Sequence, residues 1–202
     1  LARDVAAIKD RVRGSHAVNW EDHEFTSIFG AIREGYKSNK CQPIGVMVVH
    51  LCLTTGARPS EIESLRWDEI HAVPEEPTML RIIKHRHKTY ARTRRPRRIT
   101  LGAHAVAVID RAKAHHAEHG IDSPWVFPVA RGQKNTKTPH FNSTNQVCRT
   151  LSTFAGFEIR PYQFRSAYIN HALEAAESGS MALYTATLAQ VAENVGHTNT
   201  II

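Results

Sequence analysis

Residues 43–62 read PIGVMVVHLCLTTGARPSEI, and the rest of the fold is organised around this stretch. Its first part, Pro43 to Thr55, is strongly apolar and long enough for a buried helix, although its valine content keeps a strand open. Gly56 follows the apolar part, and Pro59 marks the start of a second helix. The stretch therefore predicts a buried helix, a tight turn, and an arginine presented at the start of the next helix.

Arg58 is that arginine, and it lies where free backbone N–H groups and a guanidinium together favour an anion. Glu61 follows three residues later on the same helical face and could orient the guanidinium. The alternative interpretation is that Arg58 is a surface residue and that Glu61 is its salt-bridge partner.

Outward from this stretch, spacing and cap signals predict further elements. Helices are expected at residues 1–14, from Asn19 onward, and at 103–119, 144–155, 162–176 and 185–195. Two strands, 79–83 and 98–101, flank a basic segment and predict a hairpin; 124–128 reads as a short extended piece and 131–144 as a loop. The predicted fold class is mainly α with a small antiparallel β-sheet, an α+β arrangement.

The positive charge of the chain is concentrated in one segment. The sequence holds 26 Lys and Arg against 19 Asp and Glu, a net charge of +7. Nine of the basic residues lie between Arg81 and Arg98 with no acid among them, so the remainder has a slight excess of acids. This distribution indicates a focused contact with a polyanion.

Several classes of protein are excluded by composition. No apolar run reaches 18 residues, so no transmembrane helix is expected, and Leu1 to Asp4 does not begin a signal peptide. The cysteines Cys41, Cys52 and Cys148 lack metal-ligand spacing; Cys52 is expected in the core, and a reducing compartment fits best. The histidines show no metal-ligand pattern, and no nucleotide fingerprint occurs, so no metal or cofactor is expected.

Two further motifs lie toward the C-terminal end. In residues 160–167, RPYQFRSA, Tyr162 and Arg165 are three apart on one helical face and could present a hydroxyl and a guanidinium to one phosphate. The alternative is that Tyr162 packs in the core and Arg165 extends to the surface. His197 follows Gly196 at the end of a predicted helix, and alone it has little specificity.

Together these residues resemble the catalytic domain of the tyrosine recombinases, the phage-integrase family, over roughly residues 15–202. Five family elements occur in the family's order. They are T-G-x-R-x-x-E at Thr55 to Glu61, the hairpin at Lys88-Thr89 and Arg98 to Leu101, V-F-P at Val126 to Pro128, the H-x-x-R box at Arg165, and L-G-H at Val195 to His197.

The sequence departs from the family pattern in three places. Tyr162 stands where the family has His, and residues 176–180 look like an insertion between Arg165 and His197. The family nucleophile is a Tyr about nine residues beyond the Gly-His element, a position past Ile202. None of the five tyrosines has this spacing, so no nucleophile is expected in the chain: Tyr36, Tyr90, Tyr162, Tyr168 and Tyr184.

The resemblance implies site-specific recombination, such as integration or excision, by cleaving and rejoining double-stranded DNA through a 3′-phosphotyrosine, without a cofactor or metal. It implies a role for each matched residue: Arg58 and Arg165 as phosphate clamps, Glu61 in support, Lys88 as general acid with Lys84 as the alternative, His197 as a hydrogen-bond donor to phosphate, and Tyr162 in place of the usual His. The hairpin residues expected to contact DNA are Lys84, Arg86, Arg92, Arg94, Arg95 and Arg97. About five phosphate contacts would make log K fall with log salt at a slope of about −4 to −5.

Residues 1–14 are expected to be a linker or the end of an absent upstream DNA-binding domain, and 15–202 a catalytic domain that stops before its nucleophile. Family resemblance further implies a homo-tetramer on DNA, a monomer in isolation, and a phage or mobile-element protein of a prokaryotic cytoplasm. The alternatives are a catalytically inactive DNA-binding relative, a type IB topoisomerase-like nicking-closing enzyme and, as a fallback, a basic RNA-binding domain.

Overall fold

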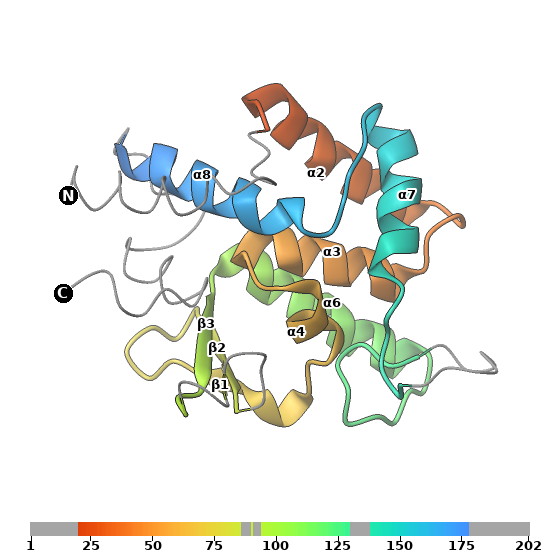
Figure 1. Cartoon of the computed structure of the whole chain (residues 1–202). Coiled ribbons are helices and arrows are strands. Elements are labelled where there is room, and N and C mark those ends of the chain that lie inside the picture. The colour runs from red at the N-terminus through yellow and green to blue at the C-terminus, as the bar shows by residue number, and fades with distance from the viewer. Residues whose placement is uncertain (1–19, 86–89, 91–93, 130–137, 178–202) are drawn as a thin grey trace.

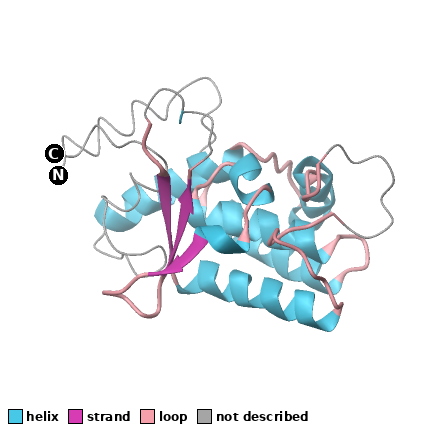
Figure 2. Cartoon of the chain, turned by 90° about the horizontal axis from the view of Figure 1, so that it is seen from below, coloured by secondary structure: helices cyan, strands magenta, loops and turns pink. Residues whose placement is uncertain are grey.

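A computed structural model of the chain describes residues 20–85, 90, 94–129 and 138–177. Helices surround a central helix, and a small sheet lies toward one end of the molecule (Figures 1 and 2). The predicted fold class, mainly α with a small antiparallel sheet, is confirmed. The elements are α2 (Asp22–Lys37), α3 (Pro43–Thr55), α4 (Pro59–Glu63), a 3-10 turn η1 (Trp67–Glu69), β1 (Ile70–Ala72), β2 (Leu80–Lys84), β3 (Arg97–Leu101), α6 (Ala103–Glu118), α7 (Thr144–Ala155) and α8 (Gln163–Glu177).

Helix α3 is the centre of the fold and contacts α2, α4, α6, α7 and α8 (Figure 1). It is apolar around its whole circumference, which is the pattern of a helix enclosed on all sides. Pro43 occupies its first turn, and Gly56 closes it in the left-handed conformation with φ 63°. The helical interpretation of this segment is confirmed, the strand alternative is wrong, and Cys52 lies in the core as predicted.

The sheet has three antiparallel strands in the order β1-β2-β3. The predicted hairpin is confirmed: Ile82 of β2 pairs with Ile99 of β3, and both are fully buried. Strand β3 contacts α3 and α6, which ties the sheet to the helices. The edge strand β1 was not predicted, because three residues of mixed polarity have no pattern of their own and form a strand only by pairing with β2.

The other predicted segments are confirmed, differ in their bounds, or lie outside the described residues. The extended piece at 124–128 is confirmed, since Trp125 and Pro128 form isolated bridges to neighbouring segments. Helix α2 begins at Asp22 with Glu21 as its N-cap rather than directly after Asn19. The predicted helices at 1–14 and 185–195, and residues 131–137 of the predicted loop at 131–144, lie outside the described residues.

A half-buried polar pair joins α2 to α3. The Tyr36 hydroxyl lies 3.2 Å from Nδ1 of His50, and the Arg111 guanidinium from α6 stacks 4.3 Å from the Tyr36 ring centre. Burial, together with the positive charges of His104 and Arg111, lowers the pKa of His50 from 6.5 to about 4. His50 is therefore neutral in the folded protein at any pH well above 4.

This pair predicts acid sensitivity of the fold. Because the pKa of His50 is lower in the folded chain than in the unfolded chain, the unfolded state binds the proton more tightly between pH 6.5 and 4. The free energy of unfolding should fall by about 3 kcal/mol as pH drops through this window, and urea denaturation at pH 7 and 4.5 measures it. His50→Gln keeps a hydrogen-bonding partner for Tyr36 and should flatten the dependence; an equally steep loss in this variant would contradict the assignment.

Candidate active site

The turn between α3 and α4 is held by its own side chains. The Thr55 hydroxyl donates to the Leu51 carbonyl at 2.6 Å and accepts from the Ala57 N–H at 3.2 Å. Gly56 adopts φ 63°, a conformation that L side chains rarely adopt. Together these features deliver Arg58 to the N-cap of α4, as the sequence predicted.

Helix α8 docks directly onto this turn. The Arg165 Nη1 donates to the carbonyl oxygen of Gly56 at 3.1 Å, and the ring of Tyr168 packs against the Gly56 backbone. A Cβ at Gly56 would lie 2.4 Å from Tyr168 Cδ1, so glycine is required both for the turn and for the close approach. The structure thus brings Arg165 to the turn that presents Arg58.

Glu61 connects two guanidiniums. Its Oε2 accepts from the Arg58 backbone N–H at 2.9 Å, and its Oε1 accepts from Arg58 Nη1 at 2.9 Å. The same Oε1 lies 3.2 Å from Nη1 of Arg97 on β3. Side-chain exposure is 5% for Glu61, 4% for Arg97 and 32% for Arg58, so the carboxylate is buried while Arg58 opens to solvent. The predicted pairing of Arg58 with Glu61 is present, but it is part of a larger arrangement.

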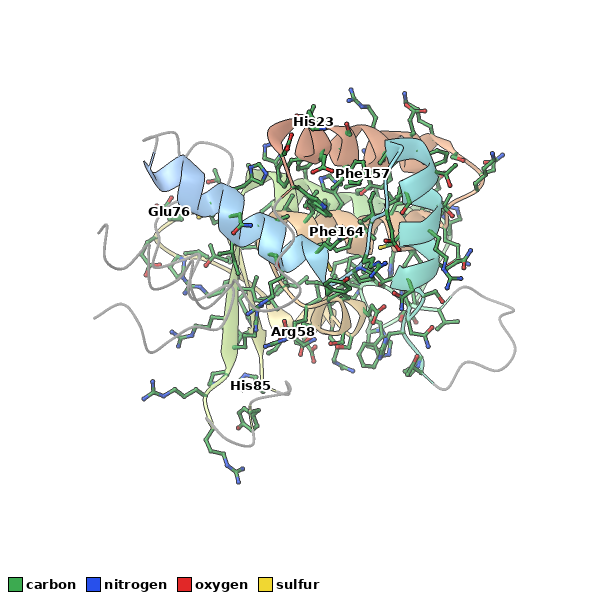
Figure 3. The ribbon with its side chains drawn as sticks, turned by 45° about the horizontal axis from the view of Figure 1, so that its top comes forward. His23, Arg58, Glu76, His85, Phe157 and Phe164 are labelled. Carbon is green, nitrogen blue, oxygen red and sulfur yellow. The ribbon has the colours of Figure 1, made fainter. Side chains whose placement is uncertain are left out.

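We call Arg58, Arg97, Arg165 and Glu61 the arginine cluster; Figure 3 shows Arg58 in the region between α8 and the sheet. Burial, followed by the positive charges of Arg97 and Arg58, lowers the pKa of Arg165 to about 9. Burial likewise lowers the pKa of Arg97 to about 10, with Glu61 acting in the opposite direction. Both guanidiniums stay charged at neutral pH and face more positive than negative charge, so an entering anion would be stabilised.

Lys84 and Arg97, both predicted to contact DNA, have buried side chains. Lys84 is buried: its Nζ donates to the Ser64 carbonyl at 2.8 Å and to Glu69 Oε2 at 3.0 Å. Arg97 is buried against Glu61. Both side chains point inward and pair with carboxylates within the protein, an arrangement that disfavours the DNA contact predicted for them.

This inward orientation had a signal in the sequence. Side chains alternate along a strand, so Arg97 is in phase with the apolar Ile99 and Leu101, and Lys84 is in phase with Ile82. Lys84 and Arg97 are also opposite each other in the register of β2 and β3. A strict reading of the alternation would have placed both toward the core.

The other predicted site residues divide by position. Arg94 and Arg95 are exposed, as expected for residues that meet a partner. Tyr162 is 45% exposed, and its hydroxyl accepts from Arg160 Nη1 at 3.2 Å, so the alternative in which it packs in the core is wrong. The tyrosine of α8 that packs in the core is Tyr168. Four predicted residues lie outside the described part of the chain: Arg86, Lys88, Arg92 and His197.

Over residues 20–177 and excluding the gaps, no group of three or more His, Cys, Asp or Glu side chains is placed to hold a metal ion. Among the helices of the same ranges, none combines the length and the apolar character needed to cross a membrane.

Comparison with solved structures gives the same fold. The chain is similar to the XerH site-specific recombinase bound to difH substrate in a pre-cleavage complex (16% identity, TM-score 0.60, covering 90% of this chain and 48% of that one). It is also similar to XerH bound to palindromic difH in a post-cleavage complex (14%, 0.60, 88% and 45%) and to the XerA recombinase (16%, 0.57, 91% and 57%). The chain thus spans about half the length of these proteins.

Comparison with curated proteins gave no match to this sequence. The model of the phage integrase family, in contrast, matches residues 20–200, which is most of the chain and includes every element described above. The matched range contains the whole arginine cluster, and the solved structures named above are recombinases. The chain therefore belongs to the phage integrase family and has the fold of the tyrosine recombinase catalytic domain.

Proposed function

We propose that the chain carries the phosphate-activating site of a site-specific DNA recombinase, which cleaves and rejoins double-stranded DNA through a 3′-phosphotyrosine. The observation that carries the proposal is the arginine cluster, in which the guanidiniums of Arg58 and Arg97 share one buried carboxylate and that of Arg165 donates to the neighbouring Gly56 carbonyl. Attack on a phosphodiester places negative charge on its non-bridging oxygens, and fixed guanidiniums can stabilise that charge without a metal. Arginine suits this task because it stays charged and binds two oxygens at once.

The cluster assigns different tasks to its two phosphate clamps. Arg58 is partly exposed and shares one Nη1 contact with Glu61, which leaves its other N–H groups for a phosphate oxygen. Arg165 donates from Nη1 to the Gly56 carbonyl, which fixes the position of its guanidinium. The two side chains would meet the phosphate from adjacent elements, α4 and α8.

The proposed chemistry conserves phosphodiester bonds. The hydroxyl of a tyrosine, which the resemblance places past Ile202, attacks the phosphorus and releases its proton to water. A new Tyr–O–P bond forms, and the bond to the 5′-oxygen breaks. The leaving oxygen takes a proton from the general acid, for which family resemblance gives Lys88, and a second 5′-hydroxyl reverses the step. His197 would donate to a phosphate oxygen.

Covalent capture tests this proposal. The full-length protein is mixed with a pool of nicked duplexes of randomised sequence, in which the released strand segment diffuses away and prevents religation. Under denaturing conditions, a covalent protein–DNA adduct is expected for the native protein and a loss of about 10²–10³-fold for Arg58→Ala. If the native protein binds the duplex tightly but forms no adduct, the proposed enzymatic activity is overturned, and the alternative of a catalytically inactive DNA-binding relative is favoured.

The exposed arginines of the hairpin predict the salt dependence of duplex binding. Each of Arg94→Ala and Arg95→Ala should weaken binding to all duplexes alike and lower the slope of log K against log salt by about 1. Fluorescence anisotropy measures this slope. The salt concentration is varied from about 50 to about 200 mM, a range in which counterion release changes the affinity strongly. Lys113→Ala, an exposed cation of α6 paired with Asp110, is the matched control and should leave the slope unchanged.

Tyr162 lies at the start of α8 in the position where the family has His. A tyrosine can donate or accept a hydrogen bond there, but an imidazole is the more usual general acid or base. Tyr162→His should therefore raise the cleavage rate of the full-length protein by about tenfold, measured in single-turnover cleavage. Unchanged cleavage would count against a role for this position.

A further inference from the structure

We propose that Arg97 is a positioning residue for Arg58: by sharing the carboxylate of Glu61, it keeps the Arg58 guanidinium available to a phosphate. The inference rests on the proposed function, because a phosphate is the ligand that the arginine cluster would take. It gives Arg97 a role different from the backbone contact expected from its place in a basic segment.

The shared oxygen is the observation that carries this inference. Oε1 of Glu61 lies 2.9 Å from Nη1 of Arg58 and 3.2 Å from Nη1 of Arg97, while Oε2 is occupied by the Arg58 backbone N–H. One carboxylate oxygen therefore serves two guanidiniums from different elements, the N-cap of α4 and the first residue of β3.

Sharing changes what Arg58 can do. A carboxylate and a single guanidinium form a strong paired contact, and a phosphate would have to compete with it. With Arg97 on the same oxygen, Glu61 is divided between two cations, and its hold on Arg58 is weaker. The cluster also keeps an excess of positive charge over the single carboxylate, which an approaching phosphate would meet.

Burial indicates that Arg97 acts through Glu61 rather than on DNA. The Arg97 side chain is 4% exposed, whereas that of Arg58 is 32% exposed. Its charge is nonetheless felt in the cluster, since it lowers the pKa of the buried Arg165 more than the charge of Arg58 does. Arg97 is thus placed to set the charge balance from behind the two clamps.

The test is the affinity of the full-length protein for inorganic phosphate, measured by ³¹P NMR titration at constant ionic strength. Arg97→Gln should weaken phosphate binding by about tenfold, because Glu61 then pairs with Arg58 alone. The double variant Arg97→Gln with Glu61→Gln should bind phosphate nearly as well as the native protein, since the competing carboxylate is gone. A double variant no tighter than Arg97→Gln would overturn the proposal and indicate that Arg97 holds the phosphate itself.

Further variants distinguish a general loss of folding in Arg97→Gln from a specific loss of phosphate binding. Glu69→Gln breaks another buried ion pair, with Lys84 on the neighbouring strand, and should leave phosphate affinity unchanged. If Arg97→Gln does not fold, Arg97→Lys, which keeps a cation near Glu61, is compared with the double variant, and both should bind phosphate. Loss of binding in Arg58→Ala but not in Arg97→Gln would overturn only the role of Arg97, whereas unchanged binding in Arg58→Ala would overturn the proposed site.

Discussion

Gly56→Ala is expected to lower the free energy of unfolding by about 2–5 kcal/mol, a large part of the stability of a domain of this size. One part is the left-handed backbone at φ 63°, which disfavours any Cβ. The larger part is steric, because the added Cβ would lie 2.4 Å from Cδ1 and 2.9 Å from Cγ of the fully buried Tyr168. Urea denaturation followed by circular dichroism measures the loss.

Gly120→Ala is the matched control for this prediction. Gly120 also has a positive φ, 57°, but a Cβ added there would meet no atom within 4 Å, so only the backbone contribution of about 1–2 kcal/mol is expected. Equal losses in the two variants would show that the Tyr168 contact adds nothing. A backbone shift at Gly56 that relieves the clash with Tyr168 would also displace Arg165, since its guanidinium donates to the Gly56 carbonyl.

Arg165→Lys is expected to slow DNA cleavage by about 10²–10³-fold while leaving duplex affinity within a few fold. Lysine keeps the positive charge, but its single ammonium lacks the planar fork of the guanidinium, which the proposed site would use to hold a phosphate while Nη1 donates to the Gly56 carbonyl. Single-turnover cleavage and anisotropy on the same duplex separate the chemical step from binding.

Arg149→Lys controls for the loss of an arginine as such. Arg149 is exposed on α7, away from the cluster, and its replacement should change neither quantity. Parallel losses of cleavage and affinity in Arg165→Lys would contradict the prediction, because they would mean that Arg165 binds DNA equally well before and during the reaction.

Local sequence determined the central part of the fold. An apolar segment bounded by Pro43 and Gly56 has no polar face to turn toward water, so a helix enclosed by others is the arrangement it favours. The hairpin strands followed equally from the apolar and β-branched residues that flank the basic segment. The edge strand β1 was not predictable in this way, because it forms only by pairing with β2. The start of α2 at Asp22 was not predictable either, because several neighbouring residues could serve as its N-cap.

The members of the site could be predicted from sequence to different degrees. The order of the motifs identified Arg58, Glu61 and Arg165, and the structure brings these three together from α4 and α8. Charge alone did not show that Lys84 and Arg97 are buried, since a run of basic residues does not say which of them face inward.

Sequence alone was enough to establish the class of the fold, its central helix and the chemistry of the residues at the turn after that helix. The sharing of Glu61 between Arg58 and Arg97 arises only in the folded chain, where α4 and β3 meet. The difference follows because a side chain's charge is a local property, whereas its burial and its partners depend on elements that come together only on folding.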